Sequence, residues 1–316
     1  MTILPFCYAD KRGWDSAHPA FSCKEILDSG HSKGDGEYWI DPEKSGNPLK
    51  VYCDMSRYGG GWLLVSNVEF GSPSPKVSVE TSYRGIGKSY MVLQESAMKE
   101  LRRHLSFTQL RFHCHKKQGR TFHVVTASNS LGEAVVRYFS GETDEQPDAC
   151  GSFVRLTLDE NSELAGICKD WGRLVSEEYF VGKWGHGEGQ DRLYSYPVLR
   201  KNKYHVRVLL HNVDDLKKME CDDRSGPNVG TNGDFWRVFL AGICKDWGKL
   251  SGKYFVGKWG HGEDQDRLYQ YPVLRKGKYH LKVHLNNVGG LDKMECDDGS
   301  GHNVDTNGDF WRVFVR

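Results

Sequence analysis

A short stretch near the start of the chain reads GEYWIDP at residues 36–42, VYCDM at residues 51–55 and GGGW at residues 59–62. The first two parts combine aromatic and branched residues, which favour strands on a half-buried sheet. Pro42 and the glycines before Trp62 mark turns. The stretch therefore predicts three short strands, at 36–42, 49–53 and 62–65.

The next hundred residues continue this pattern around one expected helix. An apolar stripe at helical spacing predicts that helix over 91–105, and its members are Leu93, Ala97, Met98, Leu101 and Leu105. Alternating apolar and polar residues predict further strands, which lie at 109–114, 121–126, 134–139 and 152–158. The expected fold class is therefore α+β, with strands in the majority.

Two nearly identical segments fill the C-terminal half. The motif LAGICKDWG begins at Leu164 and again at Leu240, and the two segments align throughout with a single one-residue gap. They represent either a recent tandem duplication or a duplicated exon in a gene model. Both are expected to be rich in strands, at 204–210 and 234–239 in the first copy and at 279–285 in the second.

This repeat divides the chain into four expected parts. They are an N-terminal extension at 1–21, a region at 22–163, a first repeat at 164–239 that completes the first domain, and a second repeat at 240–316.

Composition excludes several classes of protein. The 316 residues carry 43 Lys and Arg against 42 Asp and Glu, a formal net charge of +1. Such a balance provides no overall field for nucleic acid or an anionic membrane, and it argues against a highly acidic, mineral-templating polymer. The sequence contains no apolar run of the roughly 20 residues that a membrane-spanning helix needs.

Nine cysteines are dispersed along the chain with no C-x-x-C pair, which argues against zinc ribbons and thioredoxin-like sites. Dispersed cysteines in a glycine- and tryptophan-rich chain indicate disulfides in an oxidising compartment. The first residues, MTILPFCYADKRG, do not read as a signal peptide. We therefore expect a secreted, extracellular protein whose leader is absent from this sequence.

The N-terminal motifs resemble the opening of a fibrinogen C-terminal-like domain. The resemblance covers about Ser22 to Phe112 and includes SCKEI, GEYWI, VYCDM and GGGW. It implies a disulfide between Cys23 and Cys53. The family's C-terminal half normally carries an Asp-rich calcium loop and a nearby cysteine pair, and this cysteine pair is missing. Taken whole, the chain is similar to secreted fibrinogen-like proteins of cnidarians, including stony-coral skeletal organic matrix proteins.

The remaining disulfides are predicted from the repeats. Each copy holds two cysteines at matching places, which favours Cys168–Cys221 and Cys244–Cys296. Cys114–Cys150 then remains. Cys7 is left over, and we expect it to pair outside this chain.

Two acidic loops are the candidate metal sites. Calcium prefers oxygen ligands on flexible loops, and the loops at 222–234 and 297–309 offer carboxylates, amides and glycines. The predicted ligands are Asp222, Asp223, Asp234, Asp297, Asp298, Asp305 and Asp309. Because the same residue types are common in turns, ordinary hairpin loops are the alternative. Calcium is the one cofactor expected.

Three other motifs favour structural roles. GIGKS at 85–89 lacks the first glycine of a phosphate-binding loop and reads as a turn. In His113-Cys114-His115, alternation along a strand directs Cys114 opposite to the two histidines; a metal site is the alternative to a core-facing disulfide cysteine. The GHGE segments at 185–188 and 260–263 read as polar turns rather than catalytic pairs.

The sequence thus predicts a non-catalytic protein of the extracellular matrix, with a skeletal biomineral matrix as one setting. A lectin-like module that binds glycans with the help of calcium is the alternative. The expected partners are matrix proteins, a mineral surface or glycans, without nucleic acid or membrane insertion.

Overall fold

The computed structural model describes most of the first 156 residues and separate segments beyond them. The described residues are 11–70, 76–117, 120–156, 161–171, 174–175, 178–179, 182–185, 192–193, 198–199, 205–211, 215–221, 233–241, 273–274, 280–286 and 290–296. The chain divides into two compact units, Met1–Gly242 and Ile243–Arg316.

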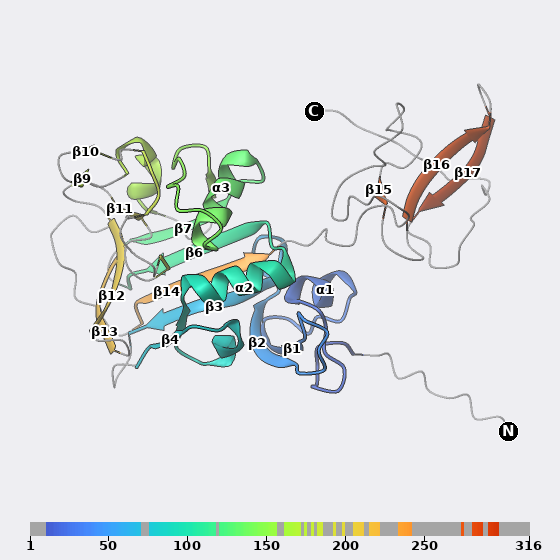
Figure 1. Cartoon of the computed structure of the whole chain (residues 1–316), viewed down its shortest axis with the longest axis horizontal. Coiled ribbons are helices and arrows are strands. Elements are labelled where there is room, and N and C mark those ends of the chain that lie inside the picture. Colours follow the sequence, from blue (N-terminus) through green and yellow to red (C-terminus); the bar gives the residue numbers. More distant parts are fainter. Residues whose placement is uncertain are drawn as a thin grey trace. The chain divides into compact units, whose positions relative to one another are not determined.

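A nine-stranded sheet forms the centre of the first unit (Figure 1). Within the described residues its main order is β1-β2-β3-β14-β6-β7-β8, and β5 pairs with both β3 and β4. The strands are β1 (Gly36–Ile40), β2 (Leu49–Asp54), β3 (Trp62–Glu69), β4 (Ser78–Glu80), β5 (Met91–Leu93), β6 (Gln109–His115), β7 (Thr121–Thr126), β8 (Phe153–Arg155) and β14 (Phe235–Ala241). The expected strand-dominated fold is confirmed for this unit.

The three consecutive glycines between β2 and β3 are needed for the turn that they form. Gly59, Gly60 and Gly61 all have positive φ angles, which side chains other than glycine rarely adopt. A Cβ atom on Gly60 would lie 2.1 Å from the carbonyl oxygen of Met55. This turn delivers Trp62 into the core, where its side chain is almost fully buried.

Strand β14 comes from the end of the first repeat, yet it lies in the middle of the sheet. It pairs antiparallel with β3 on one side and with β6 on the other, placing Val238 opposite Ser66 and Phe112. Trp236 and Val238 are fully buried. The Trp236 indole nitrogen donates a hydrogen bond to the carbonyl oxygen of Leu193 at 2.7 Å.

Within the part of the chain that the structure describes, three α-helices accompany the sheet. They are α1 (Cys23–Asp28), α2 (Glu95–Leu105) and α3 (Ser130–Phe139). Ser22 is the N-cap of α1, because its side chain accepts a hydrogen bond from the backbone amide of Glu25. Arg102 of α2 forms an ion pair with Glu133 of α3, so these two helices are neighbours (Figure 1). None of the described helices is both long and apolar enough to cross a membrane.

Two expectations about these helices are wrong. Residues 134–139 were expected as a strand but form the second half of α3, because Asn129 caps the helix by accepting a hydrogen bond from the amide of Gly132 at 2.9 Å. The helix expected from residue 91 begins at Glu95, since Met91–Leu93 pair with β3 as strand β5. The rest of the apolar stripe is buried as expected.

Short 3-10 helices and small sheets complete the described elements. The 3-10 helices are η1 (Arg57–Gly59), η2 (Tyr83–Gly87), η3 (Leu164–Gly166) and η4 (Cys168–Asp170). The first unit also contains the pair β9 (Leu174–Val175) and β10 (Glu178–Tyr179), and a sheet of β11 (Val198–Leu199), β12 (His205–His211) and β13 (Asp215–Cys221). The second unit contains a sheet of β15 (Val273–Leu274), β16 (His280–Asn286) and β17 (Gly290–Cys296).

The sheets β11-β12-β13 and β15-β16-β17 have equivalent registers. Val206 faces Cys221 in the first, and Leu281 faces Cys296 in the second. The register shifts at Leu209/Leu210 and at His284/Leu285, which are matching places in the repeat.

Candidate functional site

The predicted disulfide between Cys23 and Cys53 is confirmed. Cys23 begins α1 and Cys53 lies in β2, with 5.6 Å between their Cα atoms, and both side chains are fully buried. The bond therefore fastens the first helix to the sheet.

The other disulfides differ from the predicted scheme. Cys150 is bonded to Cys168, across 18 residues and with 5.2 Å between Cα atoms. The predicted pairs Cys168–Cys221 and Cys114–Cys150 are therefore wrong. The physical reason is that η3 and η4 bring Cys168 back beside the turn that holds Cys150, so that the bond closes a short loop.

Of the remaining cysteines, the structure describes the side chain of Cys114 alone. Cys114 is fully buried and is itself disulfide-bonded, which agrees with its expected core-facing position. Cys7, Cys244 and the side chains of Cys221 and Cys296 lie outside the described residues.

Of the predicted calcium ligands, Asp234 lies within the described residues. Its side chain is fully buried, immediately before β14. One carboxylate oxygen contacts the Lys116 ammonium nitrogen at 2.5 Å, and the other accepts a hydrogen bond from the backbone amide of Lys117 at 2.8 Å. A calcium ion would have to compete with this lysine. Asp222, Asp223, Asp297, Asp298, Asp305 and Asp309 lie outside the described residues.

A second buried ion pair lies across the same sheet. The Arg111 guanidinium of β6 contacts the Asp54 carboxylate of β2 at 2.6 Å, and both side chains are almost fully buried. The guanidinium also stacks against the rings of Trp62 and Phe239. Burial raises the pKa of Asp54, but the charge and hydrogen bond of Arg111 outweigh it and hold that pKa below its usual value.

The His113-Cys114-His115 motif lies on β6, with the two histidines on the face expected for alternating residues. The His113 ring stacks on the His123 ring with 3.7 Å between centroids and 4° between planes. Burial, reinforced by the charge of His123 and nearby arginines, lowers the pKa of His113 far below its usual value. His113 is therefore a neutral packing residue at physiological pH.

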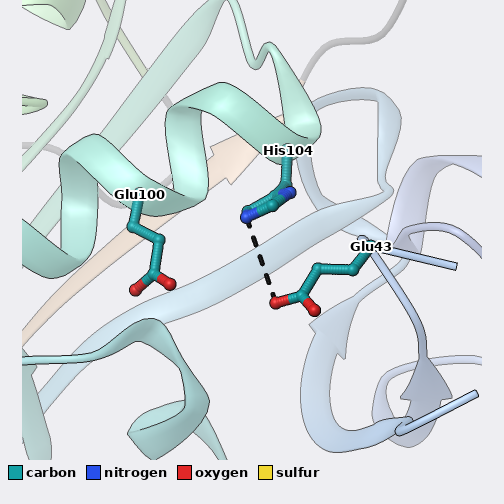
Figure 2. A group of neighbouring side chains, drawn as sticks. All are labelled: Glu43, Glu100 and His104. Atoms are coloured by element: carbon teal, nitrogen blue, oxygen red, sulfur yellow. Dashed lines mark ion pairs between the residues drawn. The ribbon is translucent and has the colours of Figure 1, made fainter. Parts of the chain in front are cut away.

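A cluster of metal-ligating side chains, which we call the Glu43 cluster, lies beside helix α2. It consists of Glu43, Glu100 and His104 (Figure 2). One potential ligand atom from each residue lies within 4.8 Å of the other two. Glu43 follows β1 in a turn, whereas Glu100 and His104 are four residues apart on α2 and therefore share one face of the helix.

Residues of the 3-10 helix η2 orient the Glu43 carboxylate. The buried Tyr83 hydroxyl donates to its Oε1 atom, and Arg84 donates to its Oε2 atom at 3.0 Å. The Tyr83 hydrogen bond, opposed in part by burial and aided by Arg84, lowers the pKa of Glu43. Burial, and then the bond to Glu43, raises the pKa of Tyr83. Glu43 is therefore anionic and Tyr83 protonated at neutral pH.

Sequence reasoning did not single out the Glu43 cluster. The four-residue spacing of Glu100 and His104 on the predicted helix was a readable signal for two ligands. Glu43 reaches them through the fold of a segment more than fifty residues earlier, and no local pattern marks it.

The N-terminal segment of the chain matches a known protein family. Residues 20–143 match the family model described as the C-terminal globular domain of fibrinogen beta and gamma chains. Angiopoietin-4 of Mus musculus is 31% identical over 134 residues, which is 42% of this chain and 26% of that protein. The fibrinogen beta chain of Petromyzon marinus is 40% identical over 50 residues, which is 16% of this chain and 10% of that protein.

The chain therefore spans about a quarter or less of the length of these curated relatives. Two solved structures, the fibrinogen-like globe domains of human ANGPTL2 and human ANGPTL6, each cover 71% of this chain, with 99% and 96% of their own lengths aligned. Their TM-scores are 0.36 and 0.37, at 13% and 14% identity. The resemblance of the N-terminal segment to a fibrinogen C-terminal-like domain is confirmed by the family match.

Proposed function

We propose that this chain is a secreted, non-catalytic binding protein of the extracellular matrix. The observation that carries the proposal is the fibrinogen-like segment at 20–143, which contains the internal disulfide Cys23–Cys53. Disulfides of this kind form and persist in oxidising surroundings. A fully buried disulfide of this kind supports a rigid module that acts through its surface.

The matrix of a mineralised skeleton is the setting that we favour for this function. The acidic loops at 222–234 and 297–309 would contribute weak calcium ligands there, as the sequence predicts. Asp234 would join such a site if Lys116 released its carboxylate. This part of the proposal rests on residue chemistry, and most of the proposed ligands lie outside the described residues.

The test is a binding assay on the full chain purified from a secreting host. Three surfaces are compared with and without EDTA: calcium carbonate powder, immobilised collagen and a glycan array. We expect retention on the mineral or the collagen that free sugars do not compete. Strong binding to the glycan array that a free sugar abolishes would replace the proposal with a lectin function. A Cys23→Ser, Cys53→Ser variant serves as the control for binding that needs the folded domain.

A further inference from the structure

We propose that Glu43, Glu100 and His104 form a zinc site on the side of the fibrinogen-like domain. The inference goes beyond the proposed matrix function and beyond the acidic loops, since it concerns different residues and a different metal. It starts from the composition of the Glu43 cluster, which is two carboxylates and one imidazole.

The ligand chemistry selects the metal. Zinc in proteins is bound by histidine nitrogen and carboxylate oxygen at about 2.0–2.2 Å, and sites with three protein ligands leave a position for water. Calcium and magnesium prefer oxygen ligands alone. An imidazole between two carboxylates therefore favours zinc over the calcium expected for the acidic loops.

The three ligand atoms must move slightly closer together to bind one zinc ion. Two ligand atoms bound tetrahedrally to one zinc ion lie about 3.5 Å apart, given the bond lengths above. The His104 Nε2 atom and the Glu43 Oε1 atom are 3.9 Å apart, and the whole set lies within 4.8 Å. Figure 2 shows the His104 ring and the Glu100 carboxylate on the same side of α2, facing the Glu43 turn. Side-chain rotations that move these atoms by about an ångström would bring them to the spacing that zinc requires.

The surroundings hold the first ligand in place and leave the site open. Tyr83 donates to Oε1 and Arg84 to Oε2 of Glu43, so these two residues fix the carboxylate as outer-shell partners commonly do for metal ligands. Because a carboxylate oxygen has two lone pairs, Oε1 could bind zinc while it still accepts the Tyr83 hydrogen bond. The Ser82 hydroxyl lies 3.4 Å from Glu100. All three ligand residues are partly exposed, so a metal ion can enter from solvent without unfolding the domain.

The chain supplies a matched control elsewhere on its surface. His18 contacts the Asp15 carboxylate at 3.0 Å, so it also forms a histidine–carboxylate pair. Neither residue belongs to a group of three potential ligands among the described residues. A site that needs three ligands predicts that His104 and His18 behave differently.

The experiment is isothermal titration of the full chain with zinc chloride, first in the absence and then in the presence of excess calcium chloride. The variants His104→Ala and Glu100→Gln are compared with His18→Ala. We expect one equivalent of zinc to be lost from the titration of each Glu43-cluster variant. Its affinity should fall by more than the roughly 10- to 100-fold that removal of an outer-shell partner costs. His18→Ala and excess calcium should leave that equivalent unchanged.

Two results would overturn the inference. One is an unchanged zinc affinity in both His104→Ala and Glu100→Gln, with unaltered thermal melting showing that both variants are folded. The other is calcium displacing the zinc equivalent, which would indicate an oxygen-only site. Glu100→Gln keeps the size of the side chain, so it remains informative if His104→Ala disturbs the packing of its ring on Tyr83. Failure here would leave the matrix proposal untouched, because that proposal is judged by retention on mineral or collagen that free sugars do not compete.

Discussion

The segment at 20–143 and strand β14 belong to the same sheet but have different origins in the sequence. The first matches the fibrinogen family and supplies the strands from β1 to β7. The second lies about a hundred residues beyond the match, at the end of the first repeat, and occupies the position between β3 and β6. The comparison teaches that the recognisable part of the domain is incomplete by itself, because its central strand comes from the repeat.

The strongest way to break this arrangement is to remove the indole of Trp236. The side chain is fully buried in β14, so we expect Trp236→Ala to lower the free energy of unfolding by about 5 kcal/mol, the upper end for a buried aromatic residue. Denaturant unfolding followed by far-UV circular dichroism measures the change.

The second repeat provides the matched control, because DFWRVF also occurs at 309–314. Trp311→Ala should leave the unfolding of the first unit unchanged. Equal destabilisation by Trp236→Ala and Trp311→Ala would show that either copy can fill the position between β3 and β6.

A smaller effect is expected from the ion pair that crosses the matched segment. Asp54→Asn would remove the negative charge that contacts the buried Arg111 guanidinium, and breaking such a pair costs about 3–5 kcal/mol. Asp28→Asn removes an exposed pair with Lys24 and should change stability by less than about 1 kcal/mol. Comparable losses in the two variants would contradict the role assigned to burial.

The disulfide within the matched segment is expected to contribute slightly less. Cys23→Ser with Cys53→Ser removes a bond across 30 residues, and we expect a loss of about 3–4 kcal/mol from unfolded-chain entropy. Non-reducing peptide mapping of the unmodified chain should recover Cys23–Cys53 and Cys150–Cys168. Recovery of Cys168–Cys221 instead would contradict the placement of η4.

The smallest predicted effect concerns pH. The pKa of His113 is lowered in the folded chain by burial and by His123, so the unfolded chain binds more protons below about pH 6.5. The free energy of unfolding should therefore fall as the pH drops from 7 to 5, with His113 contributing up to about 1.4 kcal/mol per pH unit. His113→Gln should flatten this slope. An unchanged slope in His113→Gln would assign the effect to other groups.

Local patterns predicted the strands of the matched segment well, because each combines alternation with clear turn residues. They failed where two signals conflicted: Val135, Val136 and Phe139 favour a strand, but the Asn129 cap selects a helix. The pairing of Cys150 with Cys168 depends on how two 3-10 helices fold back, which spacing alone does not encode. The Glu43 cluster likewise joins a turn to a distant helix. The division of the chain into four parts and the calcium loops stay predictions.

Hydrogen exchange measured by mass spectrometry tests the origin of the central strand most directly. The segments FWRVFLA at 235–241 and FWRVFVR at 310–316 differ in their last two residues, so their peptides can be told apart. Because β14 is paired on both sides, its amides should exchange as slowly as those of β3 and β6. Rapid exchange at 235–241, with strong protection at 310–316, would contradict the account.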